Sequence, residues 1–274
     1  MALGYTCCPI RSLTMLKATS FVAALSLALF QSPSHASADE ITILAGDLPP
    51  MFNEDGSGRE AEVISTVMER CGHTVTFEIQ PFTRHWKTYS NGTADAVATV
   101  PVGMPLGGTQ SDVYVQYQNG VSFLSEAGES YGDLAALAGH SVIAFMGASD
   151  ILPGLKDAVP SFKSYKEIAD QIGQSRMIFG KRVDAVVGDG MIFAEYNRQL
   201  REQSGDLMFD PNQSVTFQAI FAPSDYAMNF RDAALAEDFN RCYAEAKADG
   251  SIDAINKAWA ERYRDTLGTQ YLGH

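Results

Sequence analysis

The side chains that most often carry chemistry are few and scattered in this chain of 274 residues. His73 and His85 have no partner at the spacing of a metal site, and Met104, Met146 and Met177 do not form a metal-binding group. The sequence contains no nucleophile elbow and no cysteine–histidine pair. We therefore expect neither an enzyme, a cofactor nor a metal, and the remaining candidate chemistry is the formation of a disulfide and the binding of a ligand.

Residues 1–38 have the organisation of a secretory signal peptide. Lys17 precedes an apolar run at residues 21–30, and Ala36-Ser37-Ala38 forms a small-x-small cleavage site. The run is too short to span a bilayer and no later run is as long, so we expect an exported protein that is cleaved after Ala38. The alternative is an N-terminal membrane anchor. The start residue is Met1 or Met15. Met15 is a candidate because residues 1–14 add nothing that a signal peptide needs.

Two cysteines remain after this cleavage. Cys7 and Cys8 leave with residues 1–38, and the exported chain keeps Cys71 and Cys242. In an oxidising compartment two cysteines predict one disulfide, and a bond between these two would tie the C-terminal region back to the start of the chain. Two buried thiols are the alternative.

The exported chain is acidic. Loss of Arg11 and Lys17 leaves 18 basic residues against 33 acidic ones, a net charge of −15. Such a surface repels nucleic acid and anionic lipid, so we expect neither as a partner.

One sequence design occurs twice, at residues 91–101 and 180–190. Each copy has a Gly, then Asp-Ala-Val, then a small or apolar end. Gly after a helix supplies the left-handed position at which helices end, and the Val/Ala segment is a short buried strand. Ligands of open α/β sheets bind outside the carboxyl ends of the strands. We therefore expect two α/β units that each offer one edge of a single site. The alternative is that the two copies are similar by chance.

The remaining patterns alternate between strands and helices. Further strands are predicted at residues 41–45, 75–79, 119–125, 141–145 and 215–222, and helices at 60–70, 85–90, 133–139, 164–173, 191–203 and across 230–265. This order predicts an α/β fold with mostly parallel sheets. We expect a discontinuous first lobe at residues 39–125 and 218–274, a second lobe at 126–217, and two crossing strands as the hinge.

Several motifs in this order resemble one known family, and together they cover nearly all of residues 39–264. They are Asp47-Leu48-Pro49-Pro50-Met51-Phe52, Gly92-x-x-Asp95-Ala96-Val97, Ser111-Asp112-x-Tyr114, Asp133-Leu134 with Gly139-x-x-Val142, Gly180-x-x-x-Asp184-Ala185-Val186-x-x-Asp189 and Ala248-Asp249-Gly250-Ser251. The chain resembles the periplasmic solute-binding proteins of ABC transporters, of the family-3, polar amino-acid type. The Pro81-x-x-Arg84 element is similar to an atypical branch, in which the residue after Pro is usually Trp and here is Phe82.

The resemblance implies a type II-like, two-lobed fold and a set of residues at the cleft. From the first lobe and the crossing region these are Asp47, Phe52 or Met51, Arg84, Thr99, Tyr114 and Tyr117, and from the second lobe Gly147, Ala148, Ser149 and Asp189. Amino-acid binders of this family carry an Arg soon after the first Asp-Ala-Val strand, whereas this chain has none before Thr109. Arg84 could replace it, since a guanidinium suits a carboxylate, and Asp189 matches the Asp that pairs with a ligand amine.

Each of these residues also has a structural interpretation. Arg84 could be a surface residue that starts a helix, and Asp189 could only cap the helix at Met191. Met51 and Phe52 are as suited to the core as to the cleft. Tyr114 and Tyr117 alternate in direction, so one of them could pack in the core.

The resemblance implies a monomer in the periplasm that closes on a small polar or charged ligand, amino-acid-like or carboxylate-bearing, and delivers it to an ABC transporter permease. The main alternative is a periplasmic sensor that feeds a membrane receptor or kinase. A lyase or dehydratase on the same fold is a third possibility, which would use Asp47 and Asp189 as acid or base.

Overall fold

A computed structural model describes residues 1–4, 6, 40–92, 94–125, 128, 130–203, 205 and 207–274. Contacts divide the chain into Met1–Ser37 and Ala38–His274, and the second unit is described below. Apart from residues 1–4 and 6, the expected signal peptide and its cleavage site lie outside the described residues.

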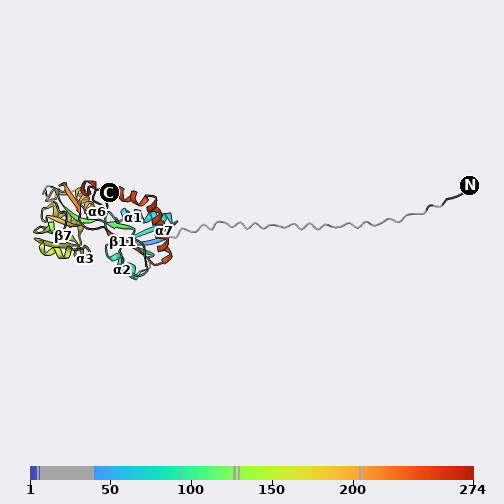
Figure 1. The fold of residues 1–274 in the computed structure, drawn as a ribbon, viewed down its shortest axis with the longest axis horizontal. Coiled ribbons are helices and arrows are strands. Elements are labelled where there is room, and N and C mark those ends of the chain that lie inside the picture. Colours follow the sequence, from blue (N-terminus) through green and yellow to red (C-terminus); the bar gives the residue numbers. More distant parts are fainter. Residues whose placement is uncertain are drawn as a thin grey trace. The chain divides into compact units, whose positions relative to one another are not determined.

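The first sheet has the strand order β2-β1-β3-β11-β4, with β5 also paired to β11 (Figure 1). Parallel pairing joins β1 to β2 and β3, whereas β11 is antiparallel to its neighbours. Its strands are β1 (Glu40–Asp47), β2 (Thr74–Pro81), β3 (Ala96–Pro101), β4 (Thr109–Gln110), β5 (Val115–Tyr117) and β11 (Ser224–Phe230). The helices associated with it are α1 (Arg59–Arg70), α2 (Arg84–Asn91), α7 (Ala233–Ala248) and α8 (Ser251–Glu261).

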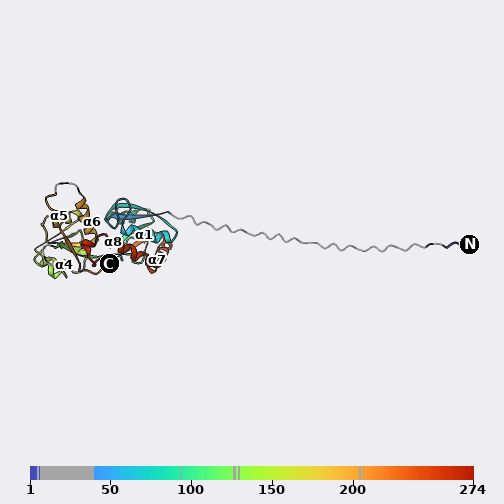
Figure 2. The same cartoon turned by 90° about the horizontal axis from the view of Figure 1, so that it is seen from above.

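The second sheet has the order β10-β6-β9-β7-β8. In it, β7 is parallel to β8 and β9, and β6 is antiparallel to β9 and β10. Figure 2 labels α4, α5 and α6 in this part of the chain. Its strands are β6 (Asn119–Leu124), β7 (Ser141–Phe145), β8 (Ser164–Ile168), β9 (Ala185–Asp189) and β10 (Val215–Ala219). Its helical elements are α3 (Ala148–Ile151), α4 (Leu155–Ala158), α5 (Gln171–Phe179), α6 (Gly190–Glu202), and the 3-10 turns Ala135–Leu137 and Val159–Ser161, while α9 (Arg264–Leu267) contacts α6 and β10.

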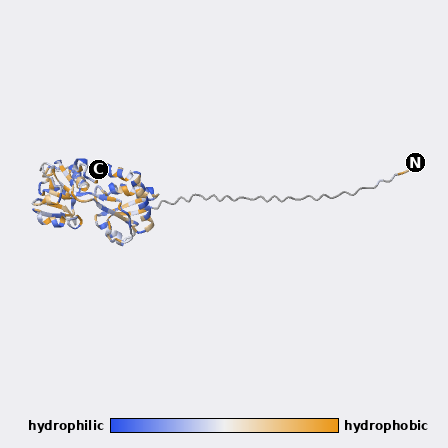
Figure 3. Ribbon diagram, in the orientation of Figure 1, coloured by the Kyte–Doolittle hydropathy of each residue, from blue (hydrophilic) through white to orange (hydrophobic). Residues whose placement is uncertain are grey.

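The central strands β3 and β9 are buried on both faces, which is why they consist mostly of apolar residues (Figure 3). In β9, Ala185 and Val187 belong to one hydrophobic cluster and Val186 to another on the opposite face. In β3, Ala96 and Ala98 likewise face away from Val97.

The two Asp-Ala-Val copies form equivalent structures, so the repeat is no accident. Asp95 precedes β3, and its Oδ2 accepts a hydrogen bond of 2.8 Å from the Thr42 N–H of the parallel neighbour β1. Asp184 precedes β9, and its Oδ2 accepts one of 2.7 Å from the Ser141 N–H of the parallel neighbour β7. Each Asp therefore fixes the start of a central strand against the strand beside it.

The chain crosses between the sheets at a different place from the one expected. Residues 119–125 were assigned to the first lobe, but β6 pairs with β9 and β10 of the second sheet. Only Gln118 separates β6 from β5, so the crossing is extended backbone without a turn signal in the sequence. The return crossing lies at residues 220–223, and the Gln118 side chain donates 2.8 Å to the Phe221 carbonyl oxygen, which ties the crossings together.

Further features differ from the sequence prediction. The helix expected at residues 133–139 is only the 3-10 turn Ala135–Leu137, and Gly92 and Gly180 follow their helices with φ of −107° and −78° rather than the expected left-handed conformation. The helix expected at residues 164–173 is divided into the edge strand β8 and the start of α5, because Tyr165 and Ile168 pack inward as the strand pairs with β7. Strand β11 was not predicted. The helical stretch from 230 to 265 is confirmed in outline, with its break at Gly250, whose φ of 84° favours glycine.

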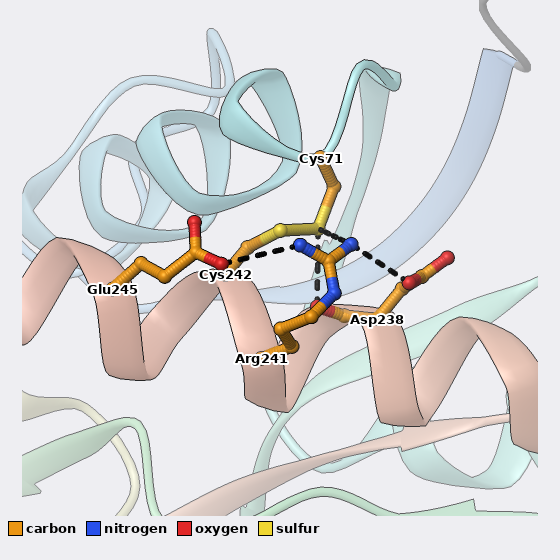
Figure 4. Close-up of a disulfide and its surroundings, with 5 residues drawn as sticks. All are labelled: Cys71, Asp238, Arg241, Cys242 and Glu245. Atoms are coloured by element: carbon orange, nitrogen blue, oxygen red, sulfur yellow. Dashed lines mark hydrogen bonds and ion pairs between the residues drawn. A yellow bond between two sulfur atoms is a disulfide. The ribbon is translucent and has the colours of Figure 1, made fainter.

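The predicted disulfide between Cys71 and Cys242 is present, with Cα atoms 5.9 Å apart (Figure 4). It joins the end of α1 to the middle of α7, across 171 residues of sequence. Arg241 lies beside it and donates to Asp238 at 2.9 Å and to Glu245 at 3.3 Å. The first helix of the fold and the C-terminal helix α7 are thus held together covalently, as the sequence predicts.

Candidate ligand site

The carboxyl edge of the first sheet carries Asp47 and Arg84. Asp47 ends β1 opposite Pro81 of β2, and Arg84 starts α2 shortly after β2. Arg84 is exposed and forms no hydrogen bond or ion pair with the described residues. The Oδ1 atom of Asp47 is buried and accepts no hydrogen bond from them. Burial, together with the nearby Glu54, raises the pKa of Asp47. This edge therefore presents a cation and a carboxyl group that have no protein partner.

Glycine is needed where α2 packs against this edge. A Cβ atom at Gly46 would lie 2.6 Å from Phe82 Cδ2 and 2.7 Å from His85 Cε1. The rings of Phe82 and His85 thus lie against the β1 backbone, and α2, which begins with Arg84, is held close to Asp47.

The other four first-lobe predictions are closed to solvent in this structure. They are Phe52, Thr99, Tyr114 and Tyr117, each at most 4% exposed. Phe52 packs edge-on against Phe77, in the core position given as its alternative. Thr99, Tyr114 and Tyr117 are instead joined by a carboxyl group that the sequence analysis did not single out.

That carboxyl group is Glu60, which is fully buried at the start of α1. It accepts hydrogen bonds from Thr99 Oγ1 at 2.8 Å, from Tyr117 OH at 2.6 Å and from Tyr114 OH. Burial outweighs these hydrogen bonds and raises the pKa of Glu60 to about 7. An acidic residue in the first turn of a helix ordinarily indicates a favourable dipole interaction at the surface, so no sequence signal revealed this role.

The neighbouring Arg59 is also buried and reaches the crossing region. Its guanidinium donates to Asn256 Oδ1 at 3.0 Å, to the Gln116 carbonyl oxygen at 3.1 Å and to Tyr271 OH at 3.3 Å. Tyr271 in turn donates 2.8 Å to Asp189 at the edge of the second sheet. A continuous polar chain therefore links α1, the crossing strand β5, the C-terminal segment and β9.

Asp189 ends β9 and is almost fully occupied by protein donors. Its Oδ1 accepts the N–H groups of Met191 at 2.9 Å and Ile192 at 3.0 Å, which makes it the N-cap of α6. Its Oδ2 accepts the Gln118 N–H at 2.9 Å and Tyr271 OH. Burial outweighs these bonds and raises the pKa of Asp189 to about 6. Asp189 therefore caps α6, as its structural interpretation predicted, and it also accepts a hydrogen bond from the segment that crosses between the sheets.

The backbone donors expected at Gly147 and Ser149 face a side chain of the protein itself. Glu167, near the end of β8, accepts the Gly147 N–H at 2.8 Å with Oε2 and the Ser149 N–H at 2.8 Å with Oε1. Tyr165 OH donates 2.7 Å to the same Oε1. Burial opposes ionisation, but the hydrogen bonds from Ser149, Tyr165 and Gly147 outweigh it and lower the pKa of Glu167 to about 2. Glu167 was not predicted, because residues 164–173 were assigned to a helix.

Tyr196 of α6 lies near carboxyl groups of both edges. Its side chain packs against a hydrophobic cluster that contains residues of both sheets and of α6 itself. Burial, Asp47 of the first sheet and Asp170 after β8 together raise the pKa of Tyr196 to about 12. Carboxyl groups from both sheets therefore act on the same side chain.

A cavity of about 700 Å³ lies elsewhere, behind the crossing strand β5 and between α7, α8 and the C-terminal residues. Tyr114 is the only predicted site residue that lines it. Within the described parts of the chain, no group of three or more potential ligands could hold a metal ion, and no helix is long and apolar enough to cross a bilayer.

Comparison with known proteins identifies the fold. No protein-family model and no curated protein matches the chain. Among solved structures, an ancestral arginine-binding protein bound to arginine aligns with a TM-score of 0.61 at 21% identity, over 82% of this chain and 99% of that one. A probable amino-acid ABC transporter extracellular-binding protein from Bacillus subtilis aligns with a TM-score of 0.65 at 17% identity, over 81% and 99% of the two chains.

A histidine kinase sensor domain with similarity to periplasmic binding proteins aligns equally well, with a TM-score of 0.63 at 15% identity over 81% of this chain and 96% of that one. The expected α/β architecture is thus confirmed. Residues 40–274 have the two-lobed fold of periplasmic solute-binding proteins.

Proposed function

We propose that this protein is an extracytoplasmic solute-binding protein that closes two lobes on a small polar or charged ligand for ABC-type uptake. The observation that carries the proposal is the pair of sheet edges. Asp47 and Arg84 at one carboxyl edge have no hydrogen-bond or ion-pair partner among the described residues, and both Asp47 and Asp170 of the other edge raise the pKa of Tyr196 in α6. Ligands of open α/β sheets bind at such edges.

The lobes in this proposal meet at the two crossings. The first lobe comprises the strands up to β5 together with β11, α7 and α8, and the second comprises β6 to β10. The hydrogen bond from Gln118 to Phe221 keeps the crossings together while their backbones bend. A signal peptide ending at Ala38 would place the protein in the periplasm, which sequencing the N-terminus of the exported protein would test.

Arg84 is the first-lobe residue that we expect to contact the ligand. A thermal-shift screen against amino acids, dicarboxylates, polyamines and small peptides would find the ligand, because binding to the native state alone raises the melting temperature. For a ligand that carries an anionic group, the shift should shrink in Arg84→Ala and persist in Lys87→Ala. Lys87 is a matched control, since it is an exposed cation one turn along the same helix. Equal shifts in both variants would remove Arg84 from the site, and no shift with any compound would contradict the function itself.

A sensor is the second candidate, favoured by the likeness to the histidine kinase sensor domain. The two roles differ in what is lost when the gene is deleted. Uptake of the labelled ligand should fall if the protein delivers to a transporter, whereas a sensor would leave uptake intact and abolish a ligand-dependent response. Recovery of the ligand unchanged after incubation would separate both roles from a lyase.

A further inference from the structure

Glu167 occupies the two backbone donors, of Gly147 and Ser149, that the sequence analysis expected at the cleft of the second lobe. Two backbone N–H groups, of Gly147 and Ser149, converge at the carboxyl edge of the second sheet, an arrangement that suits an anion. Both donors are within 2.8 Å of a carboxylate that belongs to the protein, and Tyr165 OH completes its coordination. The low pKa of Glu167 keeps it ionised throughout the physiological range.

A ligand carboxylate brought to this edge would therefore find its donors already used and a negative charge in place. Like charges brought together at an interface disfavour binding. Arg84 can hold an anion from the first lobe alone, so an anion held there gains no new contact when the lobes close. Closure requires contacts that exist only in the closed state.

The remaining charges at the two edges favour a cation. Asp47 has a buried oxygen without a hydrogen bond, and its neighbour Glu54 is also acidic. Asp170 follows β8 on the second lobe, where it caps α5 by accepting the Gly173 N–H, and its charge acts on Tyr196 together with that of Asp47. An ammonium or guanidinium group between these carboxylates would be attracted from both sides.

We propose that Glu167 is a specificity-determining residue that stands in for a ligand carboxylate, so that the ligand is an organic amine without an α-carboxylate. This inference rests on the proposed binding function and names the ligand class of the same cleft. It separates this chain from binders that hold the whole amino acid, since here the protein supplies the acid and the ligand supplies only the cation.

Matched ligand pairs test the proposal directly. Agmatine is arginine without its carboxylate, and cadaverine is lysine without its carboxylate. Titration calorimetry should show that at least one amine binds the wild-type protein about tenfold or more tightly than its amino acid. In Glu167→Ala the Gly147 and Ser149 donors are freed, so the preference should shrink to about threefold or less, or reverse.

Two further variants control the result. Glu167→Gln keeps the shape of the side chain but not its charge, so it should give an intermediate preference. It serves as the test if the Ala variant folds poorly. Glu78→Ala removes an exposed carboxylate from the edge strand β2 of the other sheet and should leave the wild-type preference unchanged. Thermal melting of each variant establishes that it is folded.

The outcomes distinguish this inference from the proposed function. Equal or tighter binding of the amino acids by the wild-type protein would overturn the role of Glu167 while leaving a binding protein. Binding of an uncharged or acidic ligand from the wider screen, with no binding of either amine, would overturn the ligand class only. Failure of every compound in that screen would count against the binding function itself.

Discussion

The two sheets have the same strand topology, but the charged side chains at their carboxyl edges differ. Those of the second sheet have hydrogen-bond partners within the protein, whereas those of the first sheet lack them among the described residues. At the first edge, Arg84 is unpaired and Asp47 has an oxygen without a donor. At the second edge, Glu167 fills the backbone donors and Asp189 accepts four hydrogen bonds. The difference indicates a division of labour, in which the first lobe offers free charges to a ligand and the second offers a preorganised carboxylate.

The first lobe also has the only disulfide among the described residues, and breaking it should have the largest effect on stability. In the chain-entropy model, a bond across 171 residues restrains the unfolded chain by roughly 5 kcal/mol. Cys71→Ala/Cys242→Ala should therefore lower the free energy of unfolding by several kcal/mol in urea titrations, and reduction of the wild-type protein should do the same. Unchanged urea midpoints would show that the two segments of the first lobe hold together without this tie.

The buried carboxyl group behind the first edge gives the next largest effect. Glu60→Gln leaves hydroxyl donors poorly paired and should cost roughly 1 to 3 kcal/mol. Because folding raises the pKa of Glu60 to about 7, the native state binds the extra proton between about pH 4.5 and 7. The contribution of Glu60 to stability is thus fully present below that window and declines as the pH rises through it.

The destabilisation caused by Glu60→Gln should consequently be larger at pH 5 than at pH 7. Comparing variant with wild type at each pH isolates Glu60 from His85, whose pKa burial lowers to about 4 and whose contribution has the opposite sign. Glu69→Gln is an exposed control on the same helix. A difference that stays constant or grows towards pH 7 would mean that Glu60 is ionised in the native state across this range.

The smallest expected effect on stability comes from removing the Asp side chain of each Asp-Ala-Val copy. Asp95→Ala removes one hydrogen bond to the neighbouring parallel strand and should cost about 1 kcal/mol, and Asp184→Ala removes the equivalent bond together with one from the Ser141 hydroxyl, so it should cost about 1 to 2 kcal/mol. Similar losses in urea titrations would show that the copies are energetic as well as structural equivalents. A loss in one variant alone would indicate that only one copy depends on this contact.

Local patterns were enough to predict most of the fold. Gly–Asp-Ala-Val marks both central strands because the Asp anchors each strand and the apolar residues are buried on both faces. Crossings and antiparallel additions were harder to predict. Gln118 crosses between the sheets without a turn residue, and β11 acquires its strand conformation from pairing with β3 and β5 rather than from its own alternation.

The site was less predictable than the fold, for a physical reason. Resemblance identified positions near the two edges, but it could not show which of their atoms are already satisfied. Glu60 and Glu167 determine that, and each reaches its partners from a segment distant in sequence. Such long-range pairing leaves no periodic signal.

The most direct test of this account is a calorimetric titration of agmatine and cadaverine, each beside its parent amino acid, into the wild-type protein, Arg84→Ala and Glu167→Ala. The account predicts that the wild-type protein prefers an amine, that Arg84→Ala binds the amine at least as tightly because a like charge is removed, and that Glu167→Ala loses the preference. Identical binding of every compound by all three proteins would contradict the assignment of the ligand site to these two edges.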